Sequence, residues 1–431
     1  MAADLRYQSG FGNHFATEAV PGTLPVGRNS PQKVAHGLYA ELLSGSAFTA
    51  PRADNRRTWM YRRQPSVVVG GSAWEPLAHA TWMTGAAMGT HTPPEALRWH
   101  PVPVPAGREV DFIDGVHTVA VNGDADAHLG VSVHLVLCNA SMKRAFVDAD
   151  GELLIVPQQG ALTLVTELGL LHVAPGEVAL IPRGLAFRVD VEGPTRAYVC
   201  ENHGAAFRLP ELGPIGSNGL ANARDFLAPV AAYDAMPQPT EVVRKFGGSL
   251  WRACAPASPF NVVAWHGNLA PLKYDTRHFM VIGTISFDHP DPSIFTVLTS
   301  PSDTPGTANC DFVIFPPRWM VGEDTFRPPW YHRNVMSEFM GLVHGQYDAK
   351  PEGFRPGGMS LHNAFVPHGP DAEAFVKASN AVLAPHKLDH TLAFMFESRW
   401  RFRCTEWALR GGALDSGYAA CWSGLADHFK A

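Results

Sequence analysis

Hydrophobic positions in this chain fall into short runs that are separated by turn-forming residues. Between about residues 59 and 200 these runs are rich in Val, Ile, Leu and Thr and are bounded by Gly, Pro, Asn or Asp, which is typical of β-strands. The runs that we predict to be strands are 66–69, 118–121, 131–137, 162–165 and 177–181. Their spacing predicts a β-sandwich or barrel.

A second β-rich block is expected in the last third of the chain. Its predicted strands are 279–287, 293–298, 311–315 and 392–402, and residues 371–379 are predicted to be helical. We interpret residues 209–273 as a connecting region, with weakly helical stretches at 222–226 and 240–246.

The two blocks predict two domains. The first 60 or so residues are rich in Gly, Pro, Asn and Ser and are expected to form an extended arm that belongs to the first domain. We place the domains at residues 1–278 and 279–431. The expected fold class is mostly β, with two jelly-roll or β-sandwich blocks joined by loop-rich and partly helical connections.

Composition narrows the class of protein. Of 431 residues, 17% are charged and 46% are hydrophobic, and 40 Gly and 36 Pro indicate a globular protein with many loops. The net charge of −6, without a clustered basic run, provides nothing that would neutralise phosphates. A nucleic acid is therefore not an expected partner, and a small substrate is.

The N-terminus lacks the apolar core of a signal peptide, and no uninterrupted apolar run of about 18 residues is present. We therefore expect a cytoplasmic protein that does not enter a membrane. The six cysteines are scattered singly, without a CxxC pair, which favours reduced, buried thiols over disulfides or a zinc ribbon.

Candidate metal ligands lie in the second block. If the segment from His332 to Glu338 is extended throughout, both side chains point to the same face, because side chains alternate along a strand. His368, in the sequence Pro-His-Gly-Pro, completes the set if it lies on a neighbouring strand. Two histidines and one carboxylate that leave other positions open are typical of non-heme Fe(II) oxygenases.

Two segments resemble the motifs of cupins. Residues 176–187 resemble the second cupin motif, but Phe187 stands where the motif has a metal-binding histidine. Residues 332–345 resemble the first motif, except that Asn334 replaces its second histidine. We therefore expect two cupin-like blocks, of which only the C-terminal one retains a metal site, and a structural role for the first.

Beyond these motifs, the chain resembles the homogentisate 1,2-dioxygenases over nearly its whole length. The segments that carry the resemblance are YQSGFGN at 7–13, DHPDPS at 288–293, FPPRW at 315–319, YHRN at 331–334, SEFMG at 337–341 and PHGPD at 367–371. Such long, ordered agreement is more specific than a metal triad.

The resemblance implies an Fe(II) enzyme that opens the ring of homogentisate with O2 to give maleylacetoacetate in tyrosine and phenylalanine catabolism. It implies that His332, Glu338 and His368 are the iron ligands and that His289 is the proton acceptor. It also implies a cytoplasmic hexamer.

The resemblance assigns substrate contacts as well. It implies that Tyr347 and His368 contact the substrate, and His362, six residues before His368, is a further candidate for the pocket. The chemistry agrees with a base at His289, because a phenolic hydroxyl has a pKa near 10 and a histidine with a pKa of about 6.5 can accept its proton at neutral pH.

Each candidate also has a simpler explanation. The chain has 20 histidines, and most histidines only make hydrogen bonds in the core or on the surface. Pro290 alone restricts the backbone of His289, and Tyr347 is also suited to end a strand. The aromatic residues Trp319, Trp330, Tyr331 and Trp400 are predicted to be core residues rather than part of the site.

Three functions are compatible with the residues alone. They are a ring-cleaving Fe(II) dioxygenase, a zinc or manganese cupin acting as an isomerase or hydrolase, and a cupin that binds or stores a ligand without catalysis. The resemblance favours the first.

Overall fold

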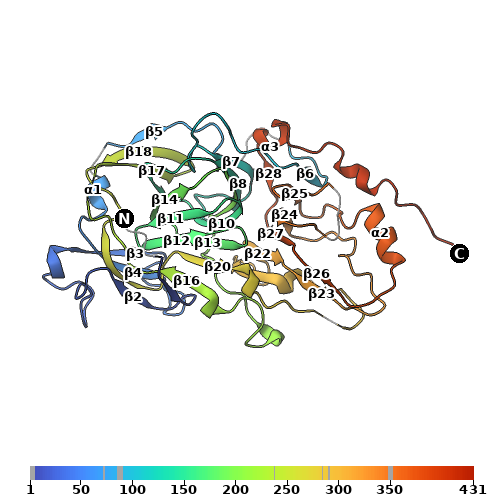
Figure 1. Cartoon of the computed structure of the whole chain (residues 1–431), viewed down its shortest axis with the longest axis horizontal. Coiled ribbons are helices and arrows are strands. Elements are labelled where there is room, and N and C mark those ends of the chain that lie inside the picture. The colour runs from blue at the N-terminus through green and yellow to red at the C-terminus, as the bar shows by residue number, and fades with distance from the viewer. Residues whose placement is uncertain are drawn as a thin grey trace.

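The computed structural model describes residues 5–70, 73–84, 91–236, 238–283, 285–289, 292–347 and 353–431. Strands provide most of the regular structure, and the helices are short (Figure 1). The predicted mostly β class is confirmed. None of the helices in these ranges combines the length and hydropathy that a bilayer-spanning helix needs.

A large sheet forms one layer of the first half of the chain. Its strands, in spatial order, are β1 (Tyr7–Ser9), β16 (Phe226–Pro229), β20 (Leu272–Asp275), β13 (Glu177–Ile181), β10 (Glu152–Gln159), β15 (Thr195–Asn202), β8 (Val131–Cys138), β7 (Val116–Val121) and β28 (Arg403–Cys404). Every residue of β8 and β15 is buried, as expected for central strands covered on both faces.

A second sheet shares its core with the first. Its strands, in spatial order, are β12 (Gly169–Val173), β11 (Leu162–Thr166), β14 (Ala186–Val191), β9 (Ala145–Asp148), β17 (Thr240–Phe246), β18 (Ser249–Ala255) and β5 (Glu75–Leu77). Buried side chains of both sheets, among them Leu135, Ile155, Leu164 and Val189, belong to one hydrophobic cluster. Phe187, the residue in place of a motif histidine, packs on Phe146 with ring centroids 5.6 Å apart.

A small sheet near the N-terminus contains β2 (Phe15–Glu18), β19 (Val262–Gly267), β4 (Arg57–Arg62) and β3 (Tyr39–Ser44). Its buried Trp265 donates a hydrogen bond from Nε1 to the carbonyl of Leu168, at 2.7 Å, which ties this sheet to the second one.

The C-terminal half contains the sheet that carries the candidate ligands. Its strands, in spatial order, are β21 (Thr296–Ser300), β22 (Cys310–Phe315), β27 (Leu392–Ser398), β24 (Ser337–His344), β25 (Met359–His362) and β6 (Leu97–Trp99), and β23 (Arg318–Met320) pairs with β26 (His386–Leu388). The α-helices of the described chain are α1 (Val67–Gly70), α2 (Ala372–Ser379) and α3 (Glu406–Arg410). The predicted helix at 371–379 is confirmed, and Asp371 caps it by accepting a hydrogen bond from the backbone N–H of Ala374.

The two halves exchange strands. Strand β6, from the first half, pairs with β25 in the C-terminal sheet, and β28, from the second half, pairs with β7 in the large sheet. Figure 1 shows β6 in blue among the orange strands of the second half. The two β-rich halves are therefore interlocked, and the boundary between 278 and 279 stays a prediction.

Several predicted elements are wrong because tertiary pairing outweighs local preference. The predicted strand at 66–69 overlaps the short helix α1. The predicted helix at 240–246 is strand β17, which pairs with both β9 and β18. Residues 279–287 form no strand in the part that the structure describes, and Ile285 and Phe287 there are exposed.

The predicted arm is also wrong, and so is the connecting region, except that its expected helical stretch at 222–226 contains the 3-10 helix η3 (Ala223–Asp225). The first 60 residues contribute β1 to the large sheet and β2, β3 and most of β4 to the small one. Residues 209–273 contribute strands to three sheets. We attribute both errors to short strands among many turns, which the sequence pattern alone does not reveal.

None of the six cysteines forms a disulfide in the described chain, as expected, but the expectation that all are buried is wrong for Cys254 and Cys421. Four of them are buried: Cys138, Cys200, Cys310 and Cys404. Cys254 is exposed.

Candidate metal centre

His332, Glu338 and His368 meet although they are not on one continuous strand. Glu338 lies at the start of β24, whereas His332 and His368 face each other in an isolated antiparallel bridge. The backbone N–H of each histidine donates to the carbonyl of the other, at 2.9 and 3.0 Å. The expectation of an extended segment from His332 to Glu338 is wrong, because β24 begins only at Ser337.

The donor atoms of the three residues converge. His368 Nε2 lies 3.0 Å from Glu338 Oε2, and His332 Nε2 lies 3.5 Å from Glu338 Oε1. One donor atom from each residue lies within 4.8 Å of the others. The arrangement has the size and composition of a metal site with two nitrogen ligands and one oxygen ligand.

Backbone carbonyls fix the orientation of both imidazoles. Nδ1 of His332 lies 2.8 Å from the carbonyl of Trp330, and Nδ1 of His368 lies 2.9 Å from that of Val366. A carbonyl only accepts, so each Nδ1 carries a proton. Each Nε2 faces Glu338 and donates to its carboxylate while it is protonated, and the loss of that proton leaves a lone pair for a metal ion.

The electrostatics favour an ionised carboxylate. Glu338 is only 6% exposed, and although burial raises its pKa, hydrogen bonds from His332, His362 and His368 hold that pKa well below its ordinary value. The hydrogen bond with Glu338 raises the pKa of His332, against the effect of burial. A buried carboxylate surrounded by imidazoles is suited to a cation.

Asn334 also holds the carboxylate of Glu338. Its Nδ2 donates to Glu338 Oε1 at 2.6 Å, and its Oδ1 accepts from the backbone N–H of Met336 at 2.6 Å. The residue that departs from the cupin motif thus orients the acidic ligand.

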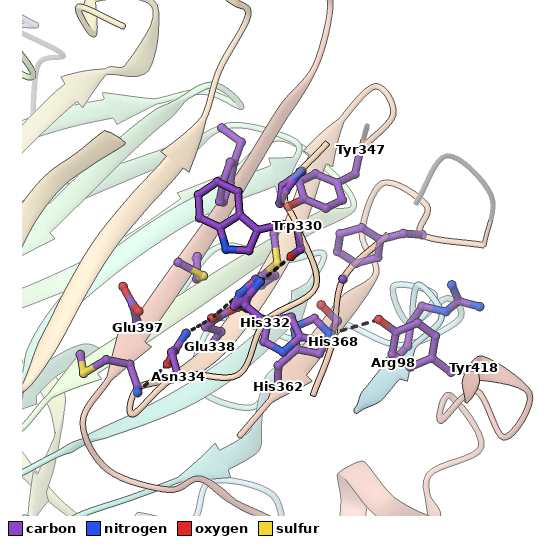
Figure 2. Close-up of a pocket in the computed structure, with 18 of the residues that line it drawn as sticks. Arg98, Trp330, His332, Asn334, Glu338, Tyr347, His362, His368, Glu397 and Tyr418 are labelled. Atoms are coloured by element: carbon purple, nitrogen blue, oxygen red, sulfur yellow. Dashed lines mark hydrogen bonds and ion pairs between the residues drawn. The ribbon is translucent and has the colours of Figure 1, made fainter. Parts of the chain in front are cut away.

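A cavity of about 380 Å³ opens beside these residues (Figure 2). Its wall is largely apolar and aromatic, and the residues that line it include Phe315, Pro329, Trp330, Met336, Met340, Phe354 and Met395. A concave, apolar cavity with a few polar groups is typical of a site for a small aromatic molecule.

The other predicted site residues line the same cavity. His289 is buried, and its ring lies edge-on to Trp330 with centroids 5.8 Å apart. Tyr347 contacts Phe315 and Phe354 edge-on, with centroid distances of 5.7 and 6.2 Å.

His362 lies on the side of His368. The two rings stack almost in parallel, with centroids 4.1 Å apart and planes 11° apart. His362 is the last residue of β25 and lies directly across from Glu338 in the strand register.

Several other residues that line the cavity were not predicted. Trp330 was predicted to be a core residue, which is wrong: its side chain is 44% exposed and borders the cavity. The same prediction is wrong for Trp319 and Tyr331, which are also exposed. Glu397 lies across from Glu338 in the pairing of β24 with β27, a relation that needs the strand register. Arg98 and Tyr418 come from β6 and from the C-terminal segment, and no sequence motif marks them.

A second cluster of acidic groups lies in the first half of the chain. Asp148, Asp150 and Glu201 have carboxylate oxygens within 4.8 Å of one another. The ammonium of Lys245 lies among them, 2.7 Å from Asp150 Oδ2 and in contact with Glu201 Oε1. This cluster already contains its own cation.

Comparisons with known proteins agree with one another. A sequence model described as "Homogentisate 1,2-dioxygenase N-terminal" matches residues 6–276, and one described as "Homogentisate 1,2-dioxygenase C-terminal" matches residues 277–429. A protein of Rhodopseudomonas palustris (strain BisB18) named homogentisate 1,2-dioxygenase is 59% identical over 98% of this chain and 94% of its own length. A protein of Nitrobacter hamburgensis with the same name is 58% identical over the same shares.

Two solved cupin structures resemble this chain only distantly. A cupin-2 domain protein from Shewanella frigidimarina is 13% identical and covers 24% of this chain and 80% of its own, with a TM-score of 0.16. A cupin 2 conserved barrel domain protein from Leptotrichia buccalis is 8% identical and covers 68% of this chain and 91% of its own, with a TM-score of 0.30.

Proposed function

Because the chain belongs to the homogentisate 1,2-dioxygenase family, we propose that it opens the aromatic ring of homogentisate with O2, using one Fe(II) ion held by His332, Glu338 and His368. The product is maleylacetoacetate, and both oxygen atoms of O2 enter it. The observation that carries the proposal is the convergence of two imidazole Nε2 atoms and one carboxylate beside an apolar cavity.

The donor set fits Fe(II). Two nitrogens and one oxygen on one side leave room for substrate and O2 on the other. Bound Fe(II) supplies the one-electron chemistry that lets triplet O2 react with a closed-shell aromatic ring. Zinc has no such redox chemistry, so the zinc alternative is less well supported.

His289 is proposed to accept a proton from a substrate hydroxyl. It lines the cavity and is buried, so its ring is held at the wall where the substrate binds. Removing that proton makes the ring more electron-rich and prepares it for oxidation. Trp330, which contacts His289 edge-on, limits where the imidazole can move.

Tyr347 and His362 are proposed to orient the substrate, together with His368. The hydroxyl of Tyr347 is suited to donate to the substrate carboxylate, and the aromatic wall formed by Phe315 and Phe354 packs against the ring. The carboxylate of Glu397 lines the same cavity and repels an anionic side chain. The substrate carboxylate is therefore expected to point away from Glu397.

The location, the pathway and the oligomeric state of the enzyme are inferred from its family. We propose that it acts in the cytoplasm in tyrosine and phenylalanine catabolism, as a hexamer, with homogentisate and O2 as its substrates. These points rest on the family to which the chain belongs.

The test combines metal analysis with oxygen consumption. Protein purified without added metal should contain iron, and it should consume one O2 per homogentisate and form a product with the ultraviolet absorption of maleylacetoacetate. Zinc without oxygen uptake would support the isomerase or hydrolase alternative. A protein without metal that binds a ligand unchanged would support the storage alternative.

Replacing Glu338 with Gln tests the ligand assignment. The substitution removes the negative charge and keeps the shape, so we expect iron affinity to fall by more than about 100-fold while circular dichroism stays that of the wild type. Iron content and turnover at wild-type levels in E338Q would contradict the assignment.

A further inference from the structure

Tyr418, in the C-terminal segment, reaches the metal centre through His362. It begins the short 3-10 helix η6 (Tyr418–Trp422) and is 2% exposed. Its hydroxyl lies 3.1 Å from Nε2 of His362. Figure 2 shows this contact as a dashed line on the side of His368 away from His332.

His362 in turn contacts two of the proposed ligands. Its ring stacks on that of His368, and its Nδ1 lies 3.8 Å from Glu338 Oε2. The imidazole therefore bridges the hydroxyl of Tyr418 and the carboxylate of Glu338, with one ring nitrogen facing each.

The charge of Glu338 determines which nitrogen of His362 carries the proton. A lone pair on Nδ1 would face an ionised carboxylate and be repelled, whereas an N–H there is attracted. With the proton on Nδ1, Nε2 must accept, and the hydroxyl of Tyr418 is its donor. Burial raises the pKa of Tyr418, so this hydroxyl keeps its proton.

We propose that Tyr418 is a positioning residue of the metal centre: it donates to His362 Nε2, keeps the proton of His362 on Nδ1, and so fixes the carboxylate of Glu338. The proposal rests on the proposed function, because it concerns the same ligands. Asn334 holds Oε1 of Glu338 by a hydrogen bond, and an N–H at Nδ1 of His362 attracts Oε2 across 3.8 Å, which is an electrostatic contact longer than a hydrogen bond.

Neighbouring side chains hold the ring of Tyr418 in place. The guanidinium of Arg98 lies over its ring, 4.4 Å from the centroid, and Trp422 contacts the ring at 5.1 Å. Arg98 is fixed by an ion pair with Asp415, at 2.6 Å, and its carbonyl accepts from the backbone N–H of Asp415. Strand β6, from the first half of the chain, thus helps to place the hydroxyl of Tyr418 against His362 in the second half.

The experiment measures Fe(II) affinity in Y418F, in the full chain and without substrate, by competition with a chelator. We expect the affinity to fall by about 10- to 100-fold, as for other groups that orient metal ligands. The matched control is Y274F, which removes another buried tyrosine hydroxyl, one without a hydrogen-bond partner in the described chain. Tyr274 lies on β20 in the large sheet and does not line the cavity. Y274F should bind Fe(II) as the wild type does.

Two further readouts separate positioning from a general effect on folding. In Y418F the increase in melting temperature that Fe(II) causes should shrink, whereas in Y274F it should equal that of the wild type, whatever the melting temperature of each metal-free variant. In a double-mutant cycle with H362F, which keeps a ring stacked on His368, Y418F should cost no further affinity. An additive loss would overturn the proposal, because Tyr418 would then act without His362.

D415N provides a second variant should Y418F fail to fold. It removes the charge that pairs with Arg98, so that Arg98 holds the ring of Tyr418 less firmly, without changing either side chain. It should weaken Fe(II) binding less than Y418F does. Wild-type affinity in the folded variants would overturn the proposal. Because no substrate is used, a wild-type protein that binds Fe(II) but does not oxidise homogentisate would contradict the proposed function and not this inference.

Discussion

At the residue scale, the role of each ligand histidine follows from what its two ring nitrogens contact. His332 and His368 each use Nδ1 on a backbone carbonyl and direct Nε2 at Glu338. These carbonyls belong to residues two positions earlier in the chain, so the local loops, rather than distant partners, set the ligand geometry.

The proton acceptor can be tested separately from the metal ligands. If His289 accepts the substrate proton, H289Q should lower kcat by about 10²- to 10⁴-fold, because general-base catalysis contributes that much. Its iron content should be unchanged, since His289 is not one of the three converging donors. Steady-state kinetics with metal analysis of the same sample gives both numbers, and unchanged kcat would exclude the role.

A buried carboxylate outside the site predicts how stability depends on pH. Burial raises the pKa of Glu152 from an ordinary 4.5 to about 7, against hydrogen bonds such as that from the backbone N–H of Phe207. The folded state therefore binds the proton more tightly than the unfolded state, and stability falls as pH rises from about 4.5 to 7.

E152Q removes this titration but keeps an acceptor for Phe207. We expect the variant to gain stability relative to wild type as pH rises, from little at pH 4.5 to about 3 kcal/mol at pH 8. Urea denaturation at several pH values measures the difference. A difference that is the same at every pH would contradict the prediction.

The residue scale is also where sequence reasoning succeeded most. The three converging residues, His289, Tyr347 and His362 were all selected from the sequence, by motif spacing or by resemblance, and all line one cavity. Arg98 and Tyr418 were missed because their positions depend on strand exchange and on a C-terminal segment, and neither leaves a local pattern in the sequence.

At the scale of elements, the length of a strand alone did not decide whether it could be predicted from the sequence. Residues 177–181 form β13 with the predicted bounds, whereas residues 240–246 form a strand that was predicted as a helix. The segment TEVVRKF has charged residues at a spacing that suits a helix, but its Val242 and Val243 are buried between β9 and β18. Pairing on both sides decided the outcome.

Strand β17 also carries the cation of the buried acidic cluster. Lys245 is 1% exposed in its side chain, and K245M would leave the carboxylates of Asp150 and Glu201 without a counter-charge. We expect a loss of about 3–5 kcal/mol in the free energy of unfolding, measured by urea denaturation.

The control for K245M is R252M on the neighbouring strand β18. Arg252 pairs with Glu75 at the surface, where both side chains are largely exposed, so its loss should cost less than about 1 kcal/mol. Equal effects of the two substitutions would show that the buried cluster contributes no more than a surface pair.

At the scale of the whole molecule, the exchange of β6 and β28 makes the two halves depend on each other. The C-terminal sheet ends on a strand from residues 97–99, and the large sheet ends on one from residues 403–404. Sequence patterns predicted two blocks of strands, but the exchange involves strands of three and two residues, which are too short to be recognised from a pattern.

This interlocking predicts a single unfolding transition. Calorimetry of the full chain should give one transition in which both halves melt together, because neither sheet is complete without the other half. Residues 279–431 expressed alone should lack fixed tertiary structure and bind Fe(II) weakly. Two separated transitions, or an isolated C-terminal half that binds Fe(II) as the full chain does, would contradict the prediction.

The central claim is that one iron ion is held by His332, Glu338 and His368. Anomalous diffraction at the iron absorption edge, from crystals of protein purified without added metal, tests it most directly. The account predicts one strong anomalous peak within bonding distance of both Nε2 atoms and of the Glu338 carboxylate. A peak at Asp148, Asp150 and Glu201 instead, or no iron peak between the three ligands, would contradict it.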